Sequence, residues 1–203
     1  MNAVVGVVLA AGEARRMGNR AKQCLPCQGE ILVHRAARTL LESGLTQVIV
    51  IAAPQQHCVF RAVADLPVQI ILNPDWEQGQ SASVRTAARA LERQHAAAAV
   101  VLPADQPFVP SALVRQLVKT WQEESRPRIV TAHISGETST PVLLDAAIFP
   151  HLHTLTGDRG ARALFGRFRP AAVTWPDPRA RAEIDTPEDY RRWCPEGAIE
   201  SLD

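Results

Sequence analysis

Residues 4–18 read VVGVVLAAGEARRMG, and this stretch indicates both a class of fold and the position of a site. Its first part, residues 4–9, is a continuous apolar run rich in β-branched side chains. Such a run is typical of a strand that is buried on both faces in a parallel sheet. The stretch then turns polar and carries Gly12 and Gly18 with two arginines between them. We therefore expect a buried strand that leads into a polar, cationic loop.

Strand-like and helix-like patterns alternate from this stretch to about residue 125. Strands are expected at 4–9, 47–53, 68–72 and 97–102, and helices at 31–43, 58–64, 81–95 and 111–124. Ser111 is the expected N-cap of the last of these helices. The alternation predicts an α/β domain with a mostly parallel sheet and right-handed crossovers.

The chain after residue 126 has a less regular pattern, and we expect an antiparallel addition to the sheet there. Strands are predicted at 128–132, 141–144 and 171–175, and short helices at 160–168 and 187–193. Thr186 is placed to cap the last helix, and Pro187 suits its first position.

The composition is that of an ordinary globular protein. Of 203 residues, 46% are hydrophobic and 21% are charged, which predicts one domain over residues 1–203. Lys and Arg number 22 against 21 Asp and Glu, a balance that disfavours duplex DNA as a partner. The apolar runs at 3–11 and 96–102 are too short to span a bilayer, and no cationic segment precedes the first. We expect a cytoplasmic protein with neither a nucleic acid nor a membrane as its partner.

Four cysteines are present, at positions 24, 27, 58 and 194, and the first two form a CxxC pair. A zinc site would need a second pair at similar spacing, and a redox CxxC would lie where a strand meets a helix. Cys58 and Cys194 are isolated, and the pair follows a long polar loop. The expectation is four small thiols, buried or half-buried, in a reducing compartment.

Three polar segments follow expected strands: the loop after residue 9, residues 73–83, and Asp105. Ligands bind beyond the carboxyl ends of the strands in such a sheet, so these segments should meet at one edge. Ala10, Ala11 and Gly12 would let a flat base or a phosphate approach free backbone N–H groups. Arg16 and Lys22 add the positive charge that a polyphosphate needs. The competing interpretation is a solvated cationic loop, since neither GxGxxG nor a P-loop is present.

Carboxylates at the same edge suggest a magnesium site. Asp105 would serve as a ligand, with the other positions filled by water and phosphate oxygens. Glu183 and Asp185 flank Ile184, so both carboxylates of an extended segment would face one side and either could complete the site. The competing interpretations are a turn aspartate at position 105 and acidic residues that favour a helix N-terminus at 183–185.

A series of short motifs runs in order over nearly the whole chain. They are LAAG at 9–12, RMG at 16–18, KQ at 22–23, LP at 25–26, NPDWEQG at 73–79 followed by Ser81 and Ser83, DQP at 105–107, GDRGAR at 157–162, and DTPED at 185–189. Each motif is weak alone. Together they resemble the MobA-like nucleotidyltransferases, and in detail the molybdenum cofactor cytidylyltransferase branch.

The resemblance implies a Rossmann-like, GT-A-type three-layer sandwich that forms a single nucleotidyltransferase domain. It implies a nucleotide site made of Leu9, Ala10, Ala11, Gly12, Arg16, Lys22, Gly79, Ser81 and Ser83. Within that site, Arg16 and Lys22 would hold the triphosphate. Asp105 would bind Mg²⁺ with Asp185 as the second carboxylate, which makes Arg16, Lys22 and Asp105 the expected catalytic residues.

The implied reaction joins CTP and molybdopterin, giving the cytosine dinucleotide cofactor and pyrophosphate, with a molybdenum hydroxylase as a possible client. Relatives with LAAG tend to use CTP and those with LAGG tend to use GTP, so Ala11 alone carries the choice of base. Bringing two phosphates together requires positioning and charge neutralisation, and no side-chain nucleophile is needed.

The acceptor side departs from the family pattern. Residues 139–141 read Ser-Thr-Pro, where the family usually has a Gly-His-Pro-type turn. Two alternatives therefore stay open. One is a guanylyl- or sugar- or alditol-phosphate nucleotidyltransferase, and the other is a non-catalytic molybdenum cofactor carrier.

Overall fold

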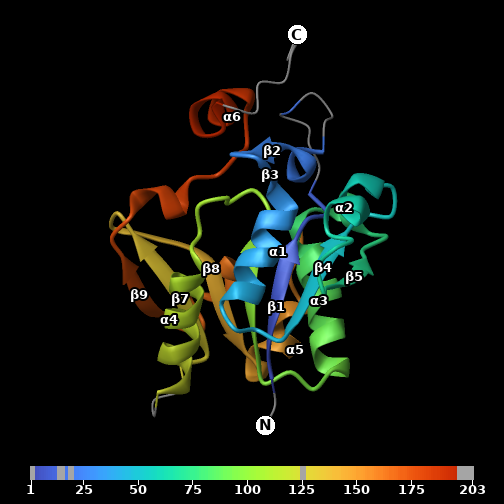
Figure 1. The fold of residues 1–203 in the computed structure, drawn as a ribbon. Coiled ribbons are helices and arrows are strands. Elements are labelled where there is room, and N and C mark those ends of the chain that lie inside the picture. The colour runs from blue at the N-terminus through green and yellow to red at the C-terminus, as the bar shows by residue number, and fades with distance from the viewer. Residues whose placement is uncertain (1–2, 13–16, 18–20, 124–126, 196–203) are drawn as a thin grey trace.

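A seven-stranded sheet runs through the computed structural model, which describes residues 3–12, 17, 21–123 and 127–195 (Figure 1). Its strands are β1 (Val4–Leu9), β4 (Gln47–Ala52), β5 (Gln69–Leu72), β6 (Ala98–Pro103), β7 (Ile129–Ile134), β8 (Glu137–Asp145) and β9 (Ala171–Trp175). They lie in the order β5-β4-β1-β6-β8-β7-β9. β8 runs antiparallel to both of its neighbours, β6 and β7, and the other described strand pairs of this sheet are parallel. The expectation of a mostly parallel sheet with an antiparallel addition is confirmed.

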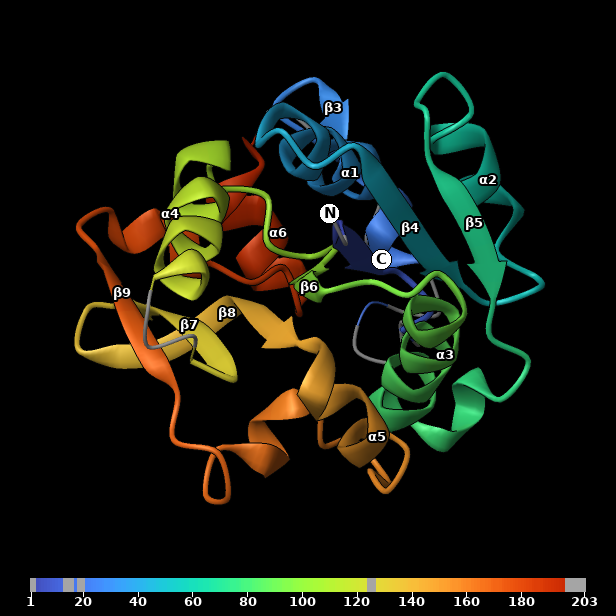
Figure 2. The same cartoon turned by 90° about the horizontal axis from the view of Figure 1, so that it is seen from below.

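Helices cover both faces of the sheet, which makes three layers. Figure 2 shows α1 (Leu32–Glu42) and α4 (Ser111–Gln122) on one side, and α3 (Gln80–Arg93) and α5 (Phe149–Leu152) on the other. A separate apolar cluster fills the space on each side of the sheet. The three-layer α/β sandwich is therefore confirmed.

The buried strand β1 lies at the centre of the sheet, between β4 and β6. Val5, Val7 and Val8 are fully buried. A Cβ at Gly6 would lie 3.1 Å from Leu40 Cδ1 of α1, so the glycine allows this helix to pack close to the sheet. Tight packing on both faces fixes where β1 ends and where its polar loop begins.

Several local expectations need correction. The helix expected at 160–168 is only a 3-10 turn, η5 (Ala161–Leu164). Ser111 does not cap α4, because Pro110 holds the N-cap position and Ser111 begins the helix. Thr186 does cap α6 (Pro187–Trp193), where it forms a reciprocal capping box with Asp189. The short hairpin of β2 (Pro26–Cys27) and β3 (Glu30–Ile31), and helix α5, were not expected.

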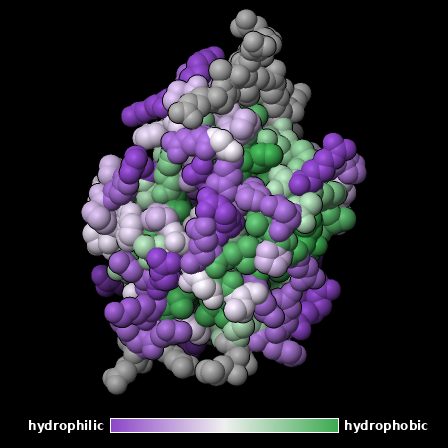
Figure 3. Space-filling view, viewed as in Figure 1, coloured by the Kyte–Doolittle hydropathy of each residue, from purple (hydrophilic) through white to green (hydrophobic). Residues whose placement is uncertain are grey.

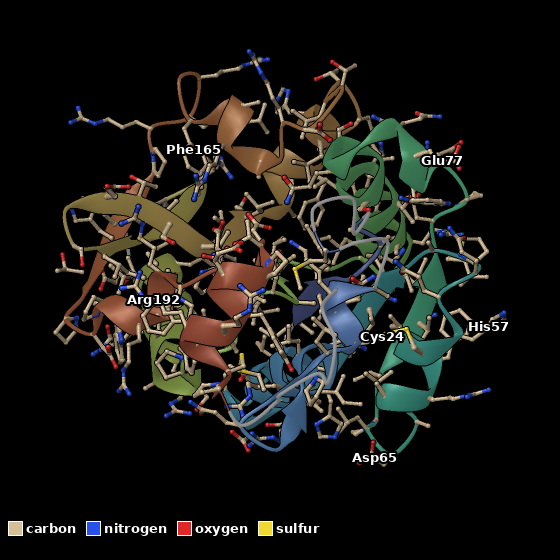
Figure 4. All side chains as sticks on the ribbon, turned by 90° about the horizontal axis from the view of Figure 1, so that it is seen from above. Cys24, His57, Asp65, Glu77, Phe165 and Arg192 are labelled. Atoms are coloured by element: carbon tan, nitrogen blue, oxygen red, sulfur yellow. A yellow bond between two sulfur atoms is a disulfide. The ribbon has the colours of Figure 1, made fainter. Side chains whose placement is uncertain are left out.

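The expectation of free thiols is wrong, because the four cysteines form two disulfides. Cys24 pairs with Cys58 of α2 (His57–Ala62), and the Cys24 bond is visible in Figure 4. Cys27 of β2 pairs with Cys194, which directly follows α6. The paired residues are 34 and 167 positions apart, so their proximity depends on the fold and not on local spacing. Disulfides are typical of oxidising compartments and not of the reducing one expected from the sequence.

Replacing Cys194 by serine should lower the free energy of unfolding by about 2–5 kcal/mol under oxidising conditions. The Cys27–Cys194 bond closes a long loop and ties α6 to β2. Denaturant unfolding of the variant and of the parent, each with and without reductant, measures the effect. Reductant should remove most of the difference. Alkylation of all four cysteines in the unreduced, denatured protein would contradict the pairing.

The face seen in Figure 3 carries hydrophilic and hydrophobic residues side by side. Across the described ranges, we find no helix that is both long and apolar enough to cross a membrane.

Candidate active site

A cavity of about 1030 Å³ opens at the carboxyl ends of β1 and β6. These strands point toward the end of the molecule where β2, β3 and α6 lie (Figure 1). The volume is at the upper end of the range for small-molecule sites, roughly 300–1,000 Å³. The lining includes residues 9–12, 22–23, 76–80, 83–84, 103–105, 157–163, 183 and 185. The three polar segments expected to converge therefore do so.

The start of the first loop forms one wall of the cavity, with Leu9, Ala10, Ala11 and Gly12 all in the lining. The buried side chain of Gln23 fixes the backbone of this wall by a hydrogen bond. Its side chain is 2% exposed, and Nε2 donates to the backbone oxygen of Ala10 at 2.8 Å. The sequence motif contained Gln23, but no local pattern showed that its amide would fix the loop.

A lysine and two aspartates form the charged centre of the site. Lys22 Nζ lies 2.5 Å from Asp105 Oδ2 and 2.5 Å from Asp185 Oδ1. The three side chains are only 14%, 19% and 24% exposed, in that order. Burial alone would lower the pKa of the Lys22 ammonium, but Asp105 and Asp185 outweigh this and hold the pKa above 10.5. The lysine is therefore charged at neutral pH.

Three separate parts of the fold deliver these groups. Lys22 begins the 3-10 turn η2 (Lys22–Cys24), and Asp105 lies two residues beyond β6. Asp185 precedes the Thr186 cap of α6. The N–H of Ile184 donates to the backbone oxygen of Asp105 at 2.9 Å, which joins the last two segments. The cluster thus depends on long-range packing that brings positions 22, 105 and 185 together.

Glu183 also lines the cavity, but it has a different partner. It accepts a hydrogen bond from Gln106 Nε2 at 2.8 Å, and Gln106 Oε1 accepts one from Thr140 Oγ1 at 2.5 Å. Burial, followed by the charge of Asp105, raises the pKa of the Glu183 carboxyl. Of the two carboxylates left open by the sequence, Asp185 is the one that shares a cation with Asp105. Thr140 lies within β8 and occupies the position where the family pattern usually has a histidine.

The donor set of the cavity fits a hard divalent cation. Asp105 Oδ2 and Asp185 Oδ1 both contact one nitrogen, so they are separated by no more than twice that contact distance. Across the described ranges, no group of three or more His, Cys, Asp and Glu side chains is arranged to hold a metal. Mg²⁺ commonly uses only one or two carboxylates and takes its other ligands from water and substrate phosphates.

The charges of the described lining also favour a bound divalent cation. Its carboxylates outnumber its cations, so polyphosphate binding there calls for added positive charge. The carboxylates are Glu77, Asp105, Asp158, Glu183 and Asp185, and the cations are Lys22, Arg159 and Arg162.

The N-terminal end of α3 also contributes to the cavity, where Gly79 and Ser83 are in the lining. Ser83 Oγ accepts a hydrogen bond from the buried Asn73. Ser81 is placed differently: it is fully buried, absent from the lining, and its hydroxyl accepts a hydrogen bond from Arg85. Direct ligand contact through the Ser81 side chain is thus not open in this arrangement. Arg16, also expected in the site, lies outside the described residues.

Replacing Gly79 by alanine should destabilise the protein by about 1–3 kcal/mol and weaken nucleotide binding. Gly79 has φ +90°, and an added Cβ would overlap Asp158 Oδ1 and lie 2.9 Å from the Gly157 oxygen. The 157–163 loop would have to move away from α3. Thermal unfolding and nucleotide titration measure the two effects. Gly166→Ala is the matched control, because its Cβ would meet nothing within 4 Å; equal effects of both variants would contradict the argument.

Comparison with known proteins gives a family and a set of relatives. The family model described as "MobA-like NTP transferase domain" matches residues 6–172. Nicotine blue oxidoreductase of Paenarthrobacter nicotinovorans is 32% identical over 201 residues, which cover 93% of this chain and 95% of that protein. Purine catabolism protein PucB of Bacillus subtilis is 33% identical, with 92% and 94% covered. A probable molybdenum cofactor guanylyltransferase of Haloferax mediterranei is 29% identical, with 70% and 64% covered.

Solved structures share the fold over nearly the full chain. The crystal structure of Rv0371c from Mycobacterium tuberculosis H37Rv superposes with a TM-score of 0.84 at 26% identity, covering 96% of this chain and 98% of that one. A second structure of Rv0371c is a complex with manganese, with a TM-score of 0.78 at 24% identity and coverage of 95% and 98%.

Proposed function

The chain belongs to the MobA-like NTP transferase family and is a nucleotidyltransferase, and from that premise we propose that it transfers a cytidylyl group from CTP to molybdopterin. The observation that carries the proposal is the Asp105–Lys22–Asp185 cluster beside the loop that ends β1. This cluster supports the proposal because it offers a triphosphate a charged lysine, and a divalent cation two hard oxygen ligands, in one cavity.

In the proposed reaction, a phosphate oxygen of molybdopterin attacks the α-phosphorus of CTP. A new P–O bond forms to the acceptor, the bond between the α-phosphorus and its bridging oxygen breaks, and pyrophosphate leaves. Both partners are anions, so the protein's task is to hold them in line and to neutralise charge.

The residues divide this task by position. Leu9, Ala10, Ala11 and Gly12 would cradle the base and ribose end, together with Gly79 and Ser83 of the same lining. Lys22 would bind phosphate oxygens, and Arg16 is proposed to join it there. Asp105 and Asp185 would hold Mg²⁺, which supplies positive charge to the phosphates. The manganese complex of Rv0371c supports a divalent cation in this family of structures.

The acceptor is assigned from two kinds of support. The Haloferax relative is named as a molybdenum cofactor enzyme, and the motif pattern resembles the cytidylyl branch. The choice of CTP over GTP rests on Ala11 in the LAAG motif, while that same relative is named as a guanylyltransferase. Guanylyl transfer is therefore the second candidate.

Pyrophosphate release tests the proposal. The protein is incubated with Mg²⁺ and CTP, GTP, ATP or UTP, each with and without molybdopterin. Release with CTP that requires molybdopterin is expected. Release with GTP and not with CTP, again dependent on molybdopterin, would make the protein a guanylyltransferase and leave the proposed reaction chemistry unchanged. Tight molybdopterin binding without release from any nucleotide would replace the transferase proposal with the cofactor carrier.

A further inference from the structure

Lys22 occupies the space between the two carboxylates that are proposed to bind the divalent cation. Its ammonium nitrogen contacts Asp105 Oδ2 and Asp185 Oδ1 at the same distance, 2.5 Å. All three side chains are largely buried, so solvent screens these contacts less than it screens surface ion pairs. The Lys22 ammonium therefore occupies the position where the divalent cation is proposed to bind.

A divalent ion and the ammonium group cannot both contact these two oxygens in this arrangement. We propose that Lys22 competes with the divalent cation for the Asp105–Asp185 pair, and that the nucleotide triphosphate ends the competition by drawing Lys22 onto its phosphates. Cation and nucleotide then bind with positive coupling. The inference rests on the proposed function, because it takes Asp105 and Asp185 as the cation's ligands.

The energetics of Lys22 explain why the nucleotide is needed. Removing a buried ammonium from its carboxylates without a new partner is costly. A triphosphate supplies charged acceptor oxygens within the same cavity, and charge-assisted hydrogen bonds to phosphate are strong. Each ligand therefore lowers the cost of binding the other, and the coupling must be reciprocal.

Glu183 is not an equivalent ion-pair partner for Lys22. Its Oε1 accepts the amide of Gln106, and that amide is oriented by Thr140. The cavity's other described cations, Arg159 and Arg162, come from the 157–163 segment, and the charge of Arg162 acts on Glu183. Lys22 is thus the side chain that links the metal pair to the nucleotide loop.

Mn²⁺ binding measured by electron paramagnetic resonance, without turnover, tests the competition. Lys22→Met should bind Mn²⁺ about 10- to 100-fold more tightly than the parent in the absence of nucleotide. The non-hydrolysable α,β-methylene analogue of CTP should tighten Mn²⁺ binding in the parent by a similar factor, and much less in the variant. Lys119→Met, which changes the exposed lysine of α4, should behave as the parent does.

Two further variants separate the possible failures. Lys22→Met/Asp105→Asn should lose the gained affinity, which would assign the gain to this pair. Equal Mn²⁺ affinity of the parent and Lys22→Met, with binding lost in Asp105→Asn, would overturn the competition and leave the proposed function standing. No Mn²⁺ binding by any protein, even with the analogue, would instead remove the cation site from the proposed function.

Protein stability gives an independent readout if Lys22→Met folds poorly. Two facing carboxylates without their lysine repel each other, and bound Mn²⁺ should relieve this repulsion. Mn²⁺ should therefore raise the Tm of Lys22→Met, or of the more polar Lys22→Gln, well above its effect on the parent. The coupling between Mn²⁺ and the analogue in the parent needs no variant, and its absence would overturn the inference by itself.

Discussion

Asp105→Asn is expected to lower kcat for pyrophosphate release by about 1,000-fold, the loss typical when one preorganised charged group is removed from a reaction centre. The substitution keeps the shape of the side chain and removes its charge. Asp105 shares the Lys22 ammonium with Asp185, and its backbone oxygen accepts the N–H of Ile184 in the segment before α6. Initial rates with saturating CTP, Mg²⁺ and molybdopterin measure the loss.

Nucleotide binding should change far less than turnover in this variant, because the loop at 9–12 and the α3 side of the cavity are untouched. Asp65→Asn serves as the control, since Asp65 is an exposed surface carboxylate at the outer edge of Figure 4. A rate for Asp105→Asn within tenfold of the parent would contradict the assignment of this residue.

Lys22→Met should lower kcat/KM for CTP by about 100- to 1,000-fold, because the transition state loses a buried positive charge beside the phosphates. The effect should appear in kcat as well as in KM, since charge on the leaving pyrophosphate grows as the bond breaks. Steady-state kinetics over a range of CTP concentrations separate the two terms.

The same variant is expected to bind Mn²⁺ more tightly while it turns over more slowly. A side chain that only supported the fold would weaken both properties together. Lys119→Met should leave both unchanged, and an equal loss of activity in Lys119→Met and Lys22→Met would contradict a specific role for Lys22.

The sequence predicted the parts of the fold that depend on short stretches of neighbouring residues. The continuous apolar run of β1 predicted its burial, and the cap at Thr186 predicted the start of α6. The position of the site followed from a general rule of parallel sheets, because each polar segment came directly after a strand. That rule placed the loop with Lys22, residues 73–83 and Asp105 at one edge of the sheet, and these segments do line one cavity. Asp185 follows no strand directly, and it was expected there as a metal-site carboxylate and from the family resemblance.

The features that the sequence did not predict depend on contacts between distant residues. The Cys27–Cys194 bond joins positions 167 residues apart, and no spacing rule relates them. Ser81 was expected near the nucleotide, yet it is fully buried and its backbone N–H donates to the oxygen of Gly157, far along the chain. Helical periodicity could not distinguish Ser81 from Ser83, because the side chains that pack against α3 come from other parts of the chain.

Nucleotidyl transfer requires attack at the α-phosphorus of the nucleotide, and labelled CTP tests this directly. The protein is incubated with Mg²⁺, molybdopterin and CTP that carries ³²P at either the α or the γ position. The α label should become attached to molybdopterin and the γ label should be released as pyrophosphate, in equal amounts. Transfer of the γ label to the acceptor, or retention of both labels in CTP while molybdopterin is bound, would contradict cytidylyl transfer to molybdopterin.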